Sequence, residues 1–80
     1  MSVQLIKGTF AVQDAIAIIT EMIHVKIRFH DAQITKSSSE EDIKYREGRI
    51  KSLQKDLYEI RKKIEAAGPR VSLHSTIEIA

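Results

Sequence analysis

The stretch AVQDAIAIITEMIHVKIRFHDAQI at residues 11–34 decides the fold. Its apolar residues recur at alternating steps of three and four, which is the spacing of an amphipathic helix. A strand over 23–29 is the competing interpretation, because polar and apolar residues alternate there. We reject the strand because the helical series continues without a break through that stretch. The first apolar line of this helix consists of Ala11, Ala15, Ile18, Met22, Val25, Phe29 and Ala32.

The same helix carries a second apolar line, about 120° away around the axis at roughly 100° per residue. It consists of Val12, Ile16, Ile19, Ile23, Ile27, His30 and Ile34. The helix is therefore apolar over more than half of its circumference, and one neighbouring helix cannot cover it.

A second helix is predicted over residues 40–67, after a turn at 36–39. Ser38 and Glu41 have capping-box spacing at its start, and Gly68-Pro69 is a typical stop signal at its end. Its apolar residues form a single stripe, with one charged gap at Arg46. The stripe consists of Ile43, Ile50, Leu53, Leu57, Ile60, Ile64 and Ala67.

Two short strands are predicted at the ends of the chain. Residues 3–10 include a β-branched segment beside Gly8 and end near Phe10, and residues 71–79 alternate with period two. The first helix then covers about 12–35. Because two long helices joined by a short turn lie antiparallel, the strands meet as an antiparallel ribbon. We expect one mainly α domain over 1–80, in the order β-α-α-β.

The uneven number of apolar lines predicts self-association. A lone core in a chain of 80 residues rarely supplies more than ~3–5 kcal/mol, and the absence of cysteine removes disulfides and thiolate metal sites as aids. The terminal ribbon is too short to shield a whole helix. We therefore expect a homodimer or higher homo-oligomer that forms a four-helix bundle. The candidate interface is the second line: Val12, Ile16, Ile19, Ile23, Ile27, His30 and Ile34.

Several function classes are not expected. The net charge is only +2, and no apolar stretch approaches the ~20 residues of a membrane span. The start of the chain does not resemble a signal peptide, so we expect a cytoplasmic protein without membrane contact. No phosphate-binding loop, nucleophile elbow or catalytic triad can be assembled. We expect neither catalytic activity nor a cofactor.

A lysine stripe on the second helix raises nucleic-acid binding as an alternative function. It consists of Lys44, Lys51, Lys55 and Lys62. The sequence favours an ordinary solvated helix instead, because acids precede bases by four residues and no aromatic side chain interleaves the lysines. The acid–base pairs are Glu40–Lys44, Asp42–Arg46, Glu47–Lys51 and Glu59–Lys63.

A histidine-based metal site is the remaining alternative. Glu21 and His24 have the spacing found in carboxylate-bridged metal bundles, with Asp31 two turns further along. Arg28 lies among them, however, and we interpret them as a solvated face. His30 lies on the second apolar line, where a histidine sets register, senses pH or meets a metal; a hydrogen-bonded histidine is the simpler interpretation. No partner is predicted for His74.

Three segments together resemble small bacterial proteins that share a long helical pair with short terminal strands. They are Leu5-Ile6-Lys7-Gly8-Thr9-Phe10, Ile27-Arg28-Phe29-His30 and Ser75-Thr76-Ile77-Glu78-Ile79. The resemblance implies the architecture and brings no activity, ligand or catalytic residue. The expected function is a small interaction, regulatory or structural module. Its expected partner is a second copy of the chain, and another protein is a further candidate partner.

Overall fold

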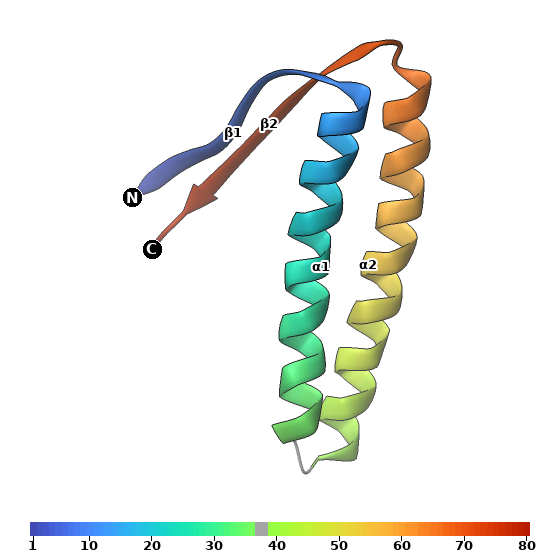
Figure 1. Ribbon diagram of the computed structural model, residues 1–80. Helices are drawn as coiled ribbons and strands as arrows, with labels where there is room; N and C mark the ends of the chain where they lie inside the picture. The colour runs from blue at the N-terminus through green and yellow to red at the C-terminus, as the bar shows by residue number, and fades with distance from the viewer. Residues whose placement is uncertain (37–38) are drawn as a thin grey trace.

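The computed structural model describes residues 1–36 and 39–80 and has the predicted β-α-α-β order (Figure 1). Strand β1 covers Ser2–Ala11, helix α1 Val12–Lys36, helix α2 Glu40–Ala66 and strand β2 Arg70–Glu78. The helices run side by side as a hairpin, and the strands leave its open end together. The stretch 23–29 is helical, so rejecting the strand interpretation is confirmed.

Helix α2 begins and ends with local signals that the sequence carries. Ser39 is the N-cap, and its side-chain oxygen accepts a hydrogen bond from the backbone N–H of Asp42 at 3.3 Å. The predicted capping residue Ser38 lies outside the described residues. At the other end Gly68 has φ = 104°, a conformation that favours glycine. The stop signal at Gly68-Pro69 is therefore confirmed.

The two terminal strands pair in antiparallel fashion and form the ribbon. The pairs Phe10–Val71, Gly8–Leu73 and Val3–Ile77 lie on one face, because directly opposite residues of an antiparallel pair share a face. We call this the inner face of the ribbon. Its residues Phe10, Val71 and Leu73 are half-buried near the helices.

Strand β1 contains a β-bulge, which shifts the alternation of its side chains between the two faces of the ribbon by one residue. Gln4 pairs with Thr76 and Ile6 with Ser75, so Leu5 has no partner in the ladder. In a regular strand without a bulge, Val3 and Ile6 are three positions apart and would point to opposite faces, since side chains alternate along a strand. The bulge places both on the inner face.

The core between the elements is small. Its buried apolar residues are Ala15, Ile23, Leu53 and Ile64, and among the described residues no large side chain is fully buried. The molecule measures 46 × 31 × 13 Å between its outermost Cα positions, with a Cα radius of gyration of 15.1 Å. It is a flat layer one helix thick, with a ribbon that leans away from α1 (Figure 1).

Candidate interaction surface

The second apolar line of α1 lies against α2. Ile23 and His30 are buried between the helices, and Ile19 lines an apolar cavity of about 300 Å³ with Ile60 and Ile64 of α2. Val12, Ile16, Ile27 and Ile34 on the same line are half-buried. The residues named above as interface candidates thus mainly close the hairpin within one chain.

The first apolar line is the one that the hairpin leaves open, and its exposure increases along the helix. Ala15 is fully buried near the base of the ribbon, and Ile18 and Met22 are half-buried. Val25 and Phe29, two turns further on, are each 56% exposed. The gradient follows the ribbon, which covers the start of α1 and then diverges from it (Figure 1).

The ribbon shows the same gradient along its inner face. Leu73 and Val71 are half-buried close to the helices, where they line the apolar cavity with Ile64. Towards the tip, Ile77 is 44% exposed, and Val3 opposite it is exposed as well. Two apolar arms, the first line of α1 and the outer half of the ribbon, therefore share a buried base and have exposed ends.

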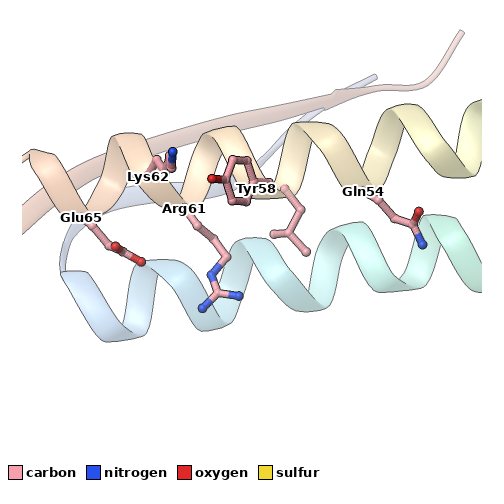
Figure 2. A pocket seen from close by; sticks show the side chains of 6 residues that line it. Gln54, Tyr58, Arg61, Lys62 and Glu65 are labelled. Carbon is pink, nitrogen blue, oxygen red and sulfur yellow. The ribbon is translucent and has the colours of Figure 1, made fainter.

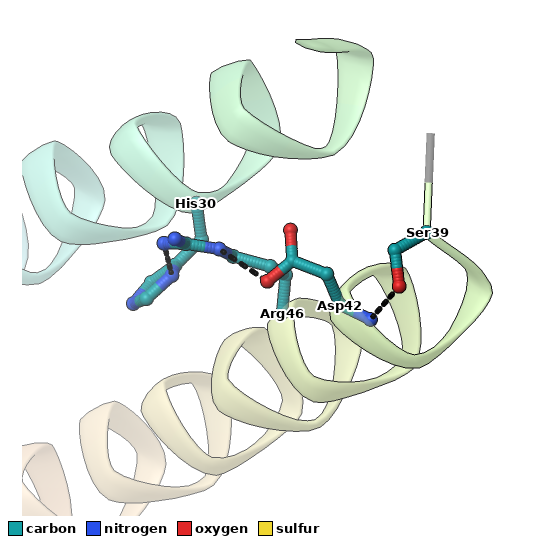
Figure 3. A network of polar contacts seen from close by, with 4 residues as sticks. All are labelled: His30, Ser39, Asp42 and Arg46. Carbon is teal, nitrogen blue, oxygen red and sulfur yellow. Dashed lines mark hydrogen bonds and ion pairs between the residues drawn. The ribbon is translucent and has the colours of Figure 1, made fainter. Parts of the chain in front are cut away.

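A polar network closes the other end of the hairpin, near the turn. The Arg46 guanidinium lies 3.0 Å from Nδ1 of His30 and 3.8 Å from a carboxylate oxygen of Asp42, whose backbone N–H donates to Ser39 (Figure 3). Arginine has only donors, so Nδ1 of His30 is the acceptor and the proton of the neutral ring is on Nε2. The guanidinium also lies over the ring of Phe29, 5.6 Å from its centre.

This environment favours the neutral form of His30. Burial, and then the positive charges of Arg46, Arg49 and Lys26, hold the pKa of His30 below its usual value of 6.5. A cation next to the ring also disfavours a metal ion there. Among residues 1–36 and 39–80, no three metal-ligating side chains gather at one place, and this includes Glu21, His24 and Asp31.

The pairing of His30 with Arg46 was missed in the sequence, although a signal for it exists. Each residue interrupts an otherwise apolar line, and the two lie almost equally far from the turn between the helices. In an antiparallel hairpin, residues equally far from the turn face one another. The two interruptions were therefore predictable as one buried polar pair.

The lysine stripe lies on the exposed side of α2, and one aromatic side chain lies beside it. The ammonium of Lys62 lies 4.6 Å from the centre of the Tyr58 ring. Both residues line a shallow groove of about 460 Å³ with Gln54, Arg61 and Glu65 (Figure 2). Lys44, Lys51 and Lys55 are exposed as well, and the predicted acid–base pair Asp42–Arg46 forms an ion pair.

No family model, curated protein or solved structure matches this chain. In the described part of the chain, neither helix has an apolar stretch long enough to cross a lipid bilayer.

Proposed function

We propose that the protein is a self-associating interaction module whose folded unit is a homodimer, with no catalytic activity of its own. The observation that carries the proposal is the excess surface of a single copy. A compact monomer of 9.1 kDa is expected to expose about 4900 Å², whereas this chain exposes 6093 Å². The difference, roughly 1200 Å² per copy, exceeds the ~800 Å² that each partner buries in a standard interface.

The dimensions of the molecule support the same proposal. A compact domain of 80 residues has a radius of gyration of about 11.6 Å, against 15.1 Å here. Domains are normally built from at least two packed layers, and this chain supplies one. A second copy against the open side supplies the missing layer, and the dimer then contains four helices.

Sedimentation equilibrium at micromolar concentration tests the proposal. We expect a species of twice the mass of one chain that dissociates only with loss of helical circular dichroism. Val25→Glu places a charge on the exposed first line and is expected to abolish the dimer. Arg28→Glu, on the polar side of the same helix turn, is the control and should leave the dimer intact. A folded monomer of the unmodified chain contradicts the proposal.

Nucleic-acid binding is a second candidate, supported by Tyr58 beside the lysine stripe. An exposed aromatic ring among cations provides both a stacking surface and phosphate contacts. Fluorescence anisotropy with labelled duplex and single strands at about 50 mM salt tests it, because phosphate contacts are strongest at low salt. Binding should weaken in Lys62→Ala and in Tyr58→Ala, while His74→Ala on the ribbon is the control. No binding at low salt dismisses this candidate.

A further inference from the structure

The two apolar arms of one copy have matching lengths. From Ile18 to Phe29 the open part of α1 is about 17 Å long, at 1.5 Å per residue. From Leu73 to Glu78 the outer half of β2 is about 17 Å long, at ~3.3 Å per residue. Beyond the shared base the ribbon leans away from α1, so neither arm covers the exposed end of the other (Figure 1).

We infer that two copies clasp each other reciprocally, with the outer ribbon of each copy seated on the open first line of α1 in the other. The inference rests on the proposed self-association and specifies which surfaces meet. Ile77 and Val3 of one copy lie against Val25 and Phe29 of the partner subunit, and the same contact recurs by two-fold symmetry. The second copy is the occupant because it supplies both complementary arms at once.

The exposure gradients support this arrangement over helix-to-helix contact alone. A dimer that joined only the α1 helices would leave the inner face of the ribbon tip uncovered, with Val3 and Ile77 in water. The reciprocal clasp covers both arms with one contact. It also accounts for the bulge at Leu5, which brings Val3 onto the inner face together with Ile6.

Cross-linking between two differently substituted chains tests the clasp. The natural chain has no cysteine, so each introduced thiol is unique. Ile77→Cys and isotope-labelled Phe29→Cys are purified separately, unfolded, mixed, refolded together and treated with a short bifunctional maleimide reagent. Both positions are substantially exposed in one chain, so neither change removes a core residue. We expect the main product to join one chain of each kind, as identified by mass.

Two further pairs serve as second test and control. Val3→Cys mixed with Val25→Cys probes the same contact from the other strand and should also cross-link. Thr76→Cys mixed with Phe29→Cys should not, because Thr76 lies on the opposite face of the ribbon from Ile77.

The possible failures are distinguishable. A dimer in which Phe29→Cys links only to itself, and never to Ile77→Cys, overturns the clasp but leaves the proposed self-association in place. A folded monomer in sedimentation overturns both. Equal linking of Ile77→Cys and Thr76→Cys to Phe29→Cys indicates random collision and also overturns the clasp.

Discussion

The His30–Arg46 pair is the clearest case in which one side chain determines the state of another. His30 is 8% exposed and accepts from a guanidinium that remains charged at all relevant pH values. The Nε atom of Arg46 is buried without a hydrogen-bond partner, because Asp42 lies at ion-pair distance only. A second positive charge at His30 would remove the hydrogen bond and place two cations side by side.

Acidification is therefore expected to destabilise the fold through His30. The pKa of His30 in the folded state lies below its unfolded value of about 6.5, so the unfolded chain binds more protons between these values. The contribution of neutral His30 to the free energy of unfolding is fully present above pH 6.5. It is lost as the pH falls through the pKa that His30 has in the folded state. Urea unfolding at a series of pH values between about 7.5 and 5 measures the decrease.

His30→Asn is the matched control for this prediction. The asparagine side chain retains an acceptor near the position of Nδ1 but does not titrate. In this variant the free energy of unfolding should vary less over the same pH interval. An identical pH profile in both proteins would show that other groups cause the acid effect.

At the scale of elements, local chemistry predicted the four segments, their types and their order. The helical spacing of apolar residues, the Gly68-Pro69 stop signal and the period of two in β2 can each be recognised from a few neighbouring residues. Which face of α1 packs against α2 was harder to predict, because both lines of α1 are apolar and either one could pack against a neighbouring helix. The bulge was not predicted either, since the positions of Val3 and Ile6 reveal it only once β2 is known to pair with β1.

Replacing Gly48, inside α2, and Gly68, just after its end, with alanine should change the stability in opposite directions. Gly68→Ala forces a side chain into φ = 104° and is expected to cost about 1 kcal/mol or more. Gly48→Ala meets no atom within 4 Å inside α2 and is expected to stabilise by about 0.5–1 kcal/mol. Urea midpoints measured side by side check both signs. Stabilisation by Gly68→Ala would contradict the stop that we describe.

The bulge predicts that β1 tolerates the loss of one particular residue. Deleting Leu5 leaves every ladder pair in place, because Leu5 has no partner, and stability should change by less than about 1 kcal/mol. Deleting Thr9 instead moves Lys7 opposite Leu73 on the inner face, at a cost of about 1–3 kcal/mol. Thermal unfolding of the two deletions compares them. An equal loss of stability in the two deletion variants would mean that the bulge itself is required for the stability of the fold.

For the whole molecule, folding and assembly are expected to be one equilibrium. If the dimer is the folded unit, the Tm rises with protein concentration by about 3–6 °C for each tenfold step, as mass action requires for two chains of this size. Differential scanning calorimetry over two decades of concentration measures the slope. A Tm independent of concentration would mean that one copy folds without its partner.

Self-association was predicted from one argument, that α1 has one apolar line more than α2 can cover. The second line was predicted to be the uncovered one, whereas in the structure the first line is exposed. Periodicity alone could not assign the uncovered line. The matching polar interruptions at His30 and Arg46 were the available signal that the second line faces α2, whereas the direction in which the ribbon leans has no such signal in the sequence. Both features depend on contacts between segments that are far apart in the chain. Periodicity is a local property, and it contains no information about how a hairpin is rotated about its own axis.

Where the ribbon ends, the backbones of Met1 and Ile79 hold each other by two hydrogen bonds, of 2.9 and 2.7 Å. Asn-Gly inserted between Ala80 and Met1 would connect the paired residues Ile79 and Met1 by three residues, convert the pair of ends into a β-hairpin and close the backbone into a ring. Such a ring would lose less conformational freedom on folding than the open chain, because its ends are already joined in the unfolded state. The ribbon thus holds Met1 and Ile79 in the relative position that a head-to-tail join of these 80 residues requires.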